Sequence, residues 1–442
     1  MKSSIKEIID IVGENNALLQ PPELDPYSVE GKTPSIVVLP KTVEEISEIV
    51  KLAFAESLAI IPWGGGTKIG LGREPRRIDV VLSTRRINRV IEHESSDLVA
   101  ITECGISLEE FQKALRDKNQ FVAIDPPHLD SGATVGGIIA TNDSGPRRLR
   151  YGTIREFLIG IKVVRSDGSI VKGGAKVVKN VAGYDLPKLY VGSLGTLGIM
   201  VEATFRLYPV PEFSQTFIAS FSTREGLQQA VNTVLNSSLV PTCLEALNPN
   251  LAGIISDKLN LNLSKGRYAL AVRMESVEKA VREQIARVKD ICEVDGILVD
   301  GNTEKDIWHE VRDFPWSEAT VSSKAVCKAS VLITDVPRVF QELEELSRNS
   351  GLRVLASARA GNGVIISSLD GEIPALVEAV GSLRNLVNSL DGTLVVHDAS
   401  PDLKSQVDVW GEVGTPLRIM KRLKSLFDPN NIFNPGRFVG GI

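Results

Sequence analysis

The hydrophobic and polar positions along the first half of the chain predict alternating helices and strands. A capping-box sequence, Thr42-Val43-Glu44-Glu45, precedes Ile46, Ile49, Val50 and Ala53, whose spacing places them on one helical face. A second capping box, Ser107-Leu108-Glu109-Glu110, begins another predicted helix. Short apolar or alternating runs predict strands at 35–39, 59–61, 78–82, 99–104, 159–164, 170–172 and 199–207.

The pattern changes after Pro209-Val210-Pro211. Predicted strands at 268–272, 326–333 and 364–368 alternate with long predicted helices at 277–291, 337–348 and 374–390. This pattern is typical of an α+β domain with an antiparallel sheet and helices on one face, and the region has room for two similar βαβ halves. One more helix is predicted at 416–427. The expected domains are 1–212, 213–402, and a segment 403–442 that returns to the first domain.

Length, charge and cysteine spacing exclude several classes of protein. A chain of 442 residues is too long for one core, and 50 Lys+Arg against 55 Asp+Glu argue against nucleic acid as the main partner. The four cysteines lie far apart, which excludes the usual iron–sulfur or zinc-ribbon spacing and fits a reducing compartment. Met1 leads into a polar segment and no run of about 18 apolar residues occurs. We therefore expect a cytoplasmic protein whose membrane contact is at most indirect.

Three glycine-rich turns predict a binding site for one extended ligand. The first runs from Pro62 to Gly72, and its Gly64-Gly65-Gly66 is expected to adopt positive φ and to offer backbone amides to a diphosphate. The others are Ala133-Thr134-Val135-Gly136-Gly137 and Gly192-Ser193-Leu194-Gly195-Thr196-Leu197-Gly198. A single such loop is consistent with a plain structural turn, whereas three together favour a shared ligand.

The common nucleotide-binding motifs do not fit. Gly31-Lys32-Thr33 has the ending of a P-loop, but Pro26 occupies the position of its leading glycine. A dinucleotide fingerprint beginning at Gly64 would need glycine at Ile69. A nucleotide must therefore be held in some other way.

Several collinear motifs resemble those of one family of flavoproteins. They are Gly64-Gly65-Gly66-Thr67, Ala133-Thr134-Val135-Gly136-Gly137, Gly152-Thr153, Asn180-Val181-Ala182-Gly183-Tyr184-Asp185, the 192–198 cluster, and Phe427-Asp428-Pro429 with Phe433-Asn434-Pro435-Gly436-Arg437. Together they are similar to the vanillyl-alcohol-oxidase-type, or PCMH-type, FAD-binding family along nearly the whole chain. Further motifs resemble the smaller FAD-binding subunit of bacterial glycolate oxidase: Asp125-Pro126-Pro127-His128, Gly145-Pro146-Arg147-Arg148, 179–186, 358–364 and Trp410-Gly411.

The resemblance implies a fold and a set of cofactor-binding residues. The implied fold is α+β, with a two-lobed PCMH-type FAD-binding domain and an α+β cap domain whose antiparallel sheet has ferredoxin-like elements. The positions that match FAD-binding positions of the family are Pro62, Gly64, Gly65, Gly66 and Thr67 at the pyrophosphate; Thr134, Gly136, Gly137, Asn142, Ser144, Gly145 and Gly152 along the ribityl and pyrophosphate; Gly195, Thr196, Gly198 and Ile199 near the adenine; and Asn434 over the isoalloxazine.

Two departures from the family pattern bear on the chemistry. The first glycine loop contains no histidine or cysteine for covalent attachment, so FAD is expected to bind non-covalently. The family's histidine-bearing segment is replaced by Ser357-Ala358-Arg359-Ala360-Gly361-Asn362-Gly363-Val364, which removes a general base and metal ligands from that place. No catalytic residue and no metal site are assigned.

The remaining titratable residues leave alternatives open. His93, His128, His309 and His397 are dispersed, and His128, the one inside a cofactor-lining motif, is interpreted as structural or supporting. The basic cluster Arg147, Arg148, Arg150 and Arg155 has several interpretations: binding of a substrate carboxylate, of cofactor phosphates or of an acidic partner, or a solvated face.

Three functional hypotheses follow. The first is an FAD-binding subunit of a glycolate or D-lactate oxidase-type dehydrogenase, with a larger related FAD subunit and an iron–sulfur subunit as partners, at the inner face of the membrane through those partners. The second is a free-standing FAD-dependent 2-hydroxy-acid dehydrogenase. The third is an assembly subunit with weak or no FAD binding. The sequence leaves open which hydroxy acid is used, whether this FAD turns over, and which acceptor takes the electrons.

Overall fold

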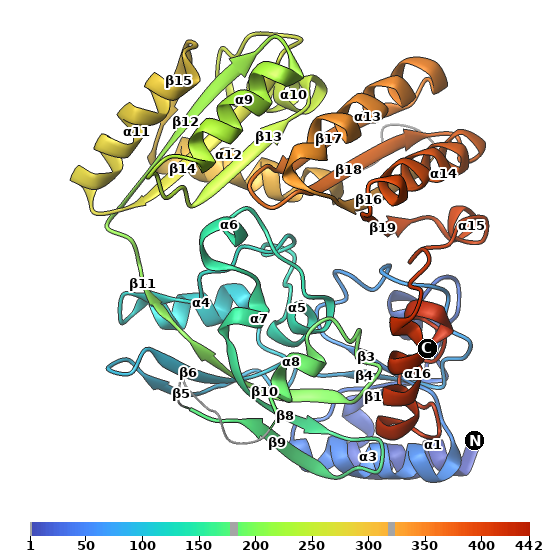
Figure 1. Cartoon of the computed structure of the whole chain (residues 1–442). Coiled ribbons are helices and arrows are strands. Elements are labelled where there is room, and N and C mark those ends of the chain that lie inside the picture. The colour runs from blue at the N-terminus through green and yellow to red at the C-terminus, as the bar shows by residue number, and fades with distance from the viewer. Residues whose placement is uncertain (1, 177–183, 317–322) are drawn as a thin grey trace. The chain divides into compact units, whose positions relative to one another are not determined.

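The computed structural model describes residues 2–176, 184–316 and 323–442, coloured along the chain in Figure 1. Contacts within the chain group these residues into two compact units. Unit 1 comprises Met1–Ser144, Thr153–Val210 and Glu412–Ile442, and unit 2 comprises Gly145–Gly152 and Pro211–Gly411. Each unit is therefore built from segments that are distant in sequence.

Unit 1 contains a small sheet that carries the first glycine-rich loop. Its strand order is β1-β2-β4-β3, with β2, β4 and β3 parallel and β1 antiparallel at one edge. The bounds are β1 Ala17–Leu18, β2 Ile36–Val38, β3 Ile60–Trp63 and β4 Val80–Ser83. Helices α1 (Lys2–Val12) and α3 (Val43–Glu56) pack against this sheet, and α3 buries the apolar face that its sequence predicts.

The second sheet of unit 1 is antiparallel, in the order β5-β6-β10-β8-β9. Its strands are β5 Val90–Glu94, β6 Val99–Glu103, β8 Leu158–Val164, β9 Ile170–Gly174 and β10 Ile199–Arg206. Sequence predicts all of these except β5, an edge strand whose residues are partly or fully exposed and so lack a buried alternating face. A two-stranded pairing of β7 (Gln120–Phe121) with β11 (Tyr208–Pro209) completes the strands of this unit.

Both predicted helix starts in unit 1 are confirmed, with one difference. Ser107 and Glu110 form a complete capping box at the start of α4 (Leu108–Arg116). At α3 the Thr42 hydroxyl accepts the Glu45 N–H at 3.1 Å, but the Glu45 carboxylate accepts the N–H of Lys41 instead of that of Thr42. One half of the expected reciprocal box is thus displaced by one residue.

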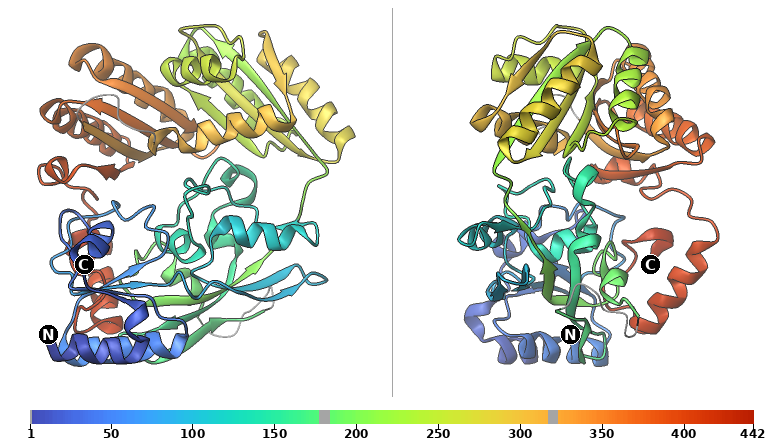
Figure 2. Two further views of the ribbon diagram at one scale, coloured as in Figure 1. Left: turned by 180° about the vertical axis from the view of Figure 1, so that it is seen from behind. Right: turned by 60° about the vertical axis from the view of Figure 1, so that its left-hand side comes forward.

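Unit 2 is built on one eight-stranded antiparallel sheet, in the order β15-β12-β14-β13-β17-β18-β16-β19. The strand bounds are β12 Phe213–Phe221, β13 Cys243–Leu247, β14 Tyr268–Ser276, β15 Gly296–Val299, β16 Ser323–Ser330, β17 Arg353–Arg359, β18 Val364–Gly371 and β19 Thr393–Ala399. Helices α9 (Arg224–Leu235), α11 (Glu278–Cys292), α13 (Val336–Ser350) and α14 (Ile373–Ser389) cover one face of this sheet (Figures 1 and 2).

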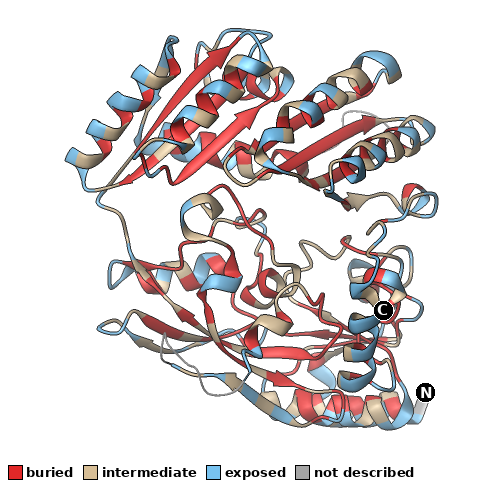
Figure 3. Cartoon of the chain, viewed as in Figure 1, coloured by how far each residue is buried: buried red, intermediate tan, exposed pale blue. Residues whose placement is uncertain are grey.

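The predicted α+β class with an antiparallel sheet is confirmed, and the sheet consists of two βαββαβ halves. In each half two helices flank four strands, and the halves join along β13 and β17. The expectation of helices on one face is incomplete, because α10 (Pro249–Leu259) and α12 (Gly301–Asp313) pack on the opposite face of the first half. In Figure 3 the strands β12, β13 and β14 are almost continuously buried, which agrees with helical cover on both sides there, whereas the edge strand β15 is partly or fully exposed.

The end of the chain packs into unit 1. Helix α16 spans Pro416–Phe427, the predicted range, and the following residues reach β3, where the Ile60 N–H donates to the Ile432 carbonyl at 2.7 Å. The Asn434 N–H donates to the Ile60 carbonyl at 3.0 Å. Within the described ranges, no helix is both long and apolar enough to cross a membrane.

Candidate functional site

The first glycine-rich loop leaves β3 beside the end of β4. The Thr84 N–H donates to the Trp63 carbonyl at 2.8 Å, and Arg85 donates to the carbonyls of Gly64 and Gly65 at 3.2 and 3.1 Å. The N–H groups of Gly65 and Gly66 donate no hydrogen bond to any other described residue. The carbonyl side of the loop is thus occupied by Arg85 while these amides stay available to an anionic ligand.

Glycine is required in this loop mainly because the second loop lies very close to it. The expectation of positive φ at all three positions is therefore wrong. Only Gly66 has positive φ, at 77°. A Cβ on Gly64 would lie 2.1 Å from the Thr134 hydroxyl oxygen, and one on Gly65 would lie 2.3 Å from the Gly132 carbonyl oxygen. Because the second loop crosses so close to the first, side chains at these positions have no room.

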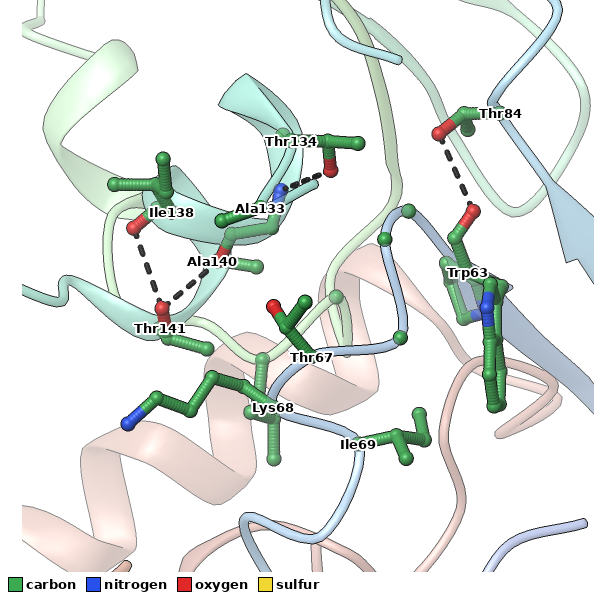
Figure 4. Close-up of a pocket in the computed structure, with 18 of the residues that line it drawn as sticks. Trp63, Thr67, Lys68, Ile69, Thr84, Ala133, Thr134, Ile138, Ala140 and Thr141 are labelled. Atoms are coloured by element: carbon green, nitrogen blue, oxygen red, sulfur yellow. Dashed lines mark hydrogen bonds between the residues drawn. The ribbon is translucent and has the colours of Figure 1, made fainter. Parts of the chain in front are cut away.

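The second loop begins the short helix α5 (Val135–Thr141). The Thr134 hydroxyl accepts the Gly137 N–H at 3.3 Å, and the Gly136 N–H donates to the Cys104 carbonyl at 2.8 Å. Figure 4 shows α5 facing the loop that carries Thr67 and Lys68 across the pocket. The capping interaction therefore fixes the part of the wall that faces the first loop.

The two loops and the third turn surround one pocket, which lies within unit 1. It contains about 890 Å³ of free space, open solvent included. Twelve of the predicted cofactor-binding residues line it: Pro62, Gly64, Gly65, Gly66, Thr67, Thr134, Gly136, Gly137, Gly195, Gly198, Ile199 and Asn434. The structure thus gathers residues from four distant segments of sequence around a single space.

Five predicted residues do not line the pocket. Asn142 and Ser144 follow α5 directly, and Thr196 is buried with its hydroxyl donating to the Ser193 carbonyl at 2.7 Å. Gly145 and Gly152 belong to unit 2, and Gly152 ends the short helix α6 (Arg148–Tyr151) with φ 86°. Residues 179–183 of the predicted 179–186 motif lie outside the described residues.

Several buried polar atoms at this site have no protein partner. Within the described part of the chain, the side-chain oxygens of Asn142, Ser144, Ser193 and Asn434 make no hydrogen bond. An unsatisfied buried acceptor costs free energy, and Asn434 lines the pocket, so its oxygen indicates a polar ligand there. The glycine walls, the available amides and this oxygen together fit an extended cofactor with a diphosphate and hydrogen-bonding edges.

The pocket also contains charged residues that sequence reasoning missed. Lys68 and Asp143 form an ion pair of 2.9 Å, and both side chains are nearly buried. Arg437 is also buried and donates to the carbonyls of Ile69 and Leu71. Burial lowers the pKa of Arg437 to about 10. Lys68 lies in the first glycine-rich loop and Arg437 ends the last of the family motifs, so their place in these motifs could have identified them as site residues.

The further lining residues are ordinary apolar or small residues. Some of them stand inside the motifs given above, namely Trp63, Ile69, Pro126, Pro127, Ala133 and Leu194. The others carry no sequence signal and are brought in by the fold: Thr84, Ile138, Ala140, Thr141 and Met200. None of the described residues that line the pocket is a histidine or a cysteine.

Two of the four clustered arginines are engaged inside unit 2. Arg147 donates to the Glu275 carboxylate at 2.6 Å, and Arg150 donates to the Glu275 backbone carbonyl. Burial tends to raise the pKa of the Glu275 carboxyl, but Arg147 and Arg273 together hold it below its usual range. Arg155 instead donates to the Lys188 carbonyl at 3.1 Å. The geometry of Arg147 and Arg150 favours a structural role.

The four histidines lie in separate parts of the structure. His93 hydrogen-bonds Gln120 at 2.9 Å, His309 lies beside Asp313 at 3.8 Å, and His397 is buried in β19. His128 follows Pro126 and Pro127, which line the pocket. No group of three His, Cys, Asp or Glu residues suited to a metal ion occurs in the part of the chain that the structure describes.

Residues 357–364 form the end of β17, a turn and the start of β18. The Ser357 hydroxyl donates to the Glu245 carboxylate at 2.5 Å, and Gly363 occupies the turn with φ 66°. The segment is therefore an ordinary hairpin of the unit 2 sheet.

Comparisons with known proteins agree with this geometry. Residues 34–174 match the family described as FAD binding domain, and residues 210–438 match FAD linked oxidases, C-terminal domain. The chain is 28% identical to "Glycolate oxidase subunit GlcD" of Bacillus subtilis (strain 168), over 91% of this chain and 88% of that protein. It is 30% identical to a D-lactate dehydrogenase of Archaeoglobus fulgidus, over 95% of this chain and 94% of that protein.

Solved structures share the fold at low sequence identity. A p-cresol methylhydroxylase with substrate bound aligns with a TM-score of 0.77 and 16% identity, covering 99% of this chain and 96% of that one. The 4-ethylphenol oxidase of Gulosibacter chungangensis aligns with a TM-score of 0.78 and 15% identity, with the same coverage. The family predicted from the motifs is confirmed.

Proposed function

The chain belongs to the family of FAD-linked oxidases, its cofactor is FAD, and we propose that it is the FAD-binding subunit of a 2-hydroxy-acid dehydrogenase of the glycolate or D-lactate type. The observation that carries the proposal is similarity over more than nine-tenths of the chain to a glycolate oxidase subunit and to a D-lactate dehydrogenase. Bound FAD would supply this chain with a redox group that can accept electrons and pass them on.

The residues around the pocket have distinct proposed roles. The amides of Gly65 and Gly66 hold the diphosphate, since the carbonyls of Gly64 and Gly65 are turned to Arg85. Thr134, Gly136 and Gly137 line the ribityl, while Gly195, Gly198 and Ile199 approach the adenine. Asn434 offers its side-chain oxygen as a hydrogen-bond acceptor, while Asn142 and Ser144 follow α5 outside the lining. Thr196 stabilises its turn from outside the lining, through its hydrogen bond to the Ser193 carbonyl.

The subunit role rests on what this chain offers for proton transfer. Oxidation of a 2-hydroxy acid requires a base for the hydroxyl proton, and a positioned base contributes on the order of 10²–10⁴ in rate. The hairpin 357–364 supplies no such base. Arg147, a candidate for binding the substrate carboxylate, is paired with Glu275 instead. In this proposal a larger related FAD subunit oxidises the acid. An iron–sulfur subunit takes the electrons onward, because the four cysteines of this chain are separate and buried.

A free-standing dehydrogenase is the second candidate. It is favoured by the near full-length similarity to the D-lactate dehydrogenase of Archaeoglobus fulgidus, whose name describes no subunit. In that case the candidates for the base are His128, which follows two pocket-lining prolines, and His309.

Anaerobic mixing of the purified chain with glycolate or D-lactate tests the proposal. The flavin absorption band is expected to persist, while dithionite bleaches it and shows that the flavin is reducible. Rapid bleaching by either acid would contradict the subunit role and favour the second candidate. His128→Asn then tests the base, because loss of bleaching with unchanged flavin content would assign it.

A further inference from the structure

Helix α16 carries one buried ammonium group. Lys424 is 7% exposed, whereas its neighbours Lys421 and Arg422 on the same helix are exposed. Its Nζ donates to the Thr196 carbonyl at 2.9 Å, to the Asp428 carboxylate at 2.6 Å and to the Phe433 carbonyl at 2.8 Å. An ammonium has three N–H groups, so every donor is satisfied. A buried charge this fully bonded fixes the geometry of the groups around it.

Asp428 extends the same network into the Asn-Pro-Gly segment. Its carboxylate accepts the N–H of Ile432 at 3.0 Å and the N–H of Phe433 at 2.8 Å, and the residue is 1% exposed. The ion pair with Lys424 therefore orders the backbone immediately before Asn434.

Asn434 is held from two sides and presents one atom without a partner. Its backbone N–H donates to Ile60, its side-chain Nδ2 donates to the Leu194 carbonyl at 2.6 Å, and its φ is 45°. Its Oδ1 is buried, makes no hydrogen bond within the described chain, and belongs to a pocket-lining residue. This oxygen can only accept, so the ligand group that it meets must be an N–H or O–H donor.

We propose that Lys424 is a positioning residue for FAD, acting through Asn434. The ammonium joins the turn that contains Leu194 and Thr196 to the segment that contains Phe433 and Asn434. These two segments are the ones that fix the Asn434 amide, through Leu194 on one side and the backbone on the other. Lys424 thereby aims the Asn434 Oδ1 at a donor of the cofactor without lining the pocket itself. The inference rests on FAD binding and not on the identity of the hydroxy acid.

A double-mutant cycle on FAD affinity tests this role. Apoprotein of the wild type, Lys424→Met, Asn434→Ala and the double variant is titrated with FAD, and quenching of flavin fluorescence is measured. Each single variant is expected to bind FAD at least tenfold more weakly, and the double variant is expected to bind about as weakly as the weaker single variant. Lys421→Met, an exposed lysine on the same helix, is the matched control and should bind like the wild type.

Two further readouts separate positioning from a general loss of structure. The flavin absorption spectra of Lys424→Met and Asn434→Ala at saturating FAD should shift in the same way, because both remove the same aimed acceptor. The Asn434→Ala apoprotein should still unfold in a single cooperative transition, at a lower temperature than the wild type because the Leu194 carbonyl loses its donor and alanine is strained at φ 45°. Additive losses of affinity in the cycle, different spectral shifts, or wild-type affinity of Lys424→Met would each overturn the proposal.

If Lys424→Met does not fold, Asp428→Asn replaces it in the cycle, since it weakens the same ion pair while keeping the side-chain shape. Non-additivity with Asn434→Ala is again expected, and additivity again contradicts the proposal. FAD affinity and spectra are measured without any hydroxy acid, so failure here is distinguishable from failure of the proposed dehydrogenase role.

Discussion

Gly65 illustrates how single residues in the pocket wall are constrained by contact distance. We expect Gly65→Val to yield protein without flavin, because even its Cβ would lie 2.3 Å from the Gly132 backbone oxygen and the loops would have to separate. Flavin content per protein after purification is the measurement. Gly253→Val, on α10 with no atom near its added Cβ, is the matched control and should retain flavin. Equal flavin in both variants would refute the role of the loop.

Glu275 gives a prediction about pH at the same scale. Its pKa in the folded protein is lowered, so its stabilising contribution is present above the unfolded carboxyl value of about 4.3 and is lost as pH falls through the folded pKa. Glu275→Gln should lower the free energy of unfolding by about 3–5 kcal/mol at pH 7, because Arg147 and Arg273 lose their buried counter-charge. Urea unfolding at pH 7 and below pH 4 should show this difference shrinking. Glu278→Gln, an exposed pair on α11, should change little at either pH.

At the scale of elements, two helix caps separate stability from cofactor binding. Thr134 caps α5 and lines the pocket, whereas Thr42 caps α3 and is not among the residues lining that pocket. Thr134→Ala and Thr42→Ala should each lower the free energy of unfolding by about 1 kcal/mol. Only Thr134→Ala should also weaken FAD binding in a titration of the apoprotein. Comparable FAD affinity in both variants would show that the α5 start does not position the cofactor.

At the scale of the whole molecule, the mode of cofactor retention is a prediction from the sequence that the structure does not test. No histidine or cysteine occurs between Pro62 and Gly72, so FAD should be released when the protein is precipitated with acid. Yellow supernatant after centrifugation is the expected result. Flavin retained in the pellet would indicate a covalent bond to a residue elsewhere in the chain.

Local pattern was sufficient for many of the elements and for part of the pocket. Helix α16 was predicted with its observed bounds because its apolar positions and its Asp-Pro stop act within a few residues. The glycine-rich stretches of the sequence predicted Gly64, Gly136 and Gly195 as pocket residues. Glycine is needed there because a side chain would occupy the space where the backbone approaches a ligand. The family followed from the order of these motifs, each of which is short and local.

Contacts between distant segments lay beyond any local pattern. The reason glycine is needed at Gly64 is the Thr134 hydroxyl, seventy positions later in the chain, and not positive φ. Glu275 neutralises Arg147 across a separation of 128 positions, which no charge pattern along the sequence specifies. The sequence does not distinguish Lys424 from the other basic residues of its helix, yet in the folded chain Lys424 is buried against Thr196 and Phe433. Burial and pairing depend on which segments meet, and these contacts form only when the chain packs in three dimensions.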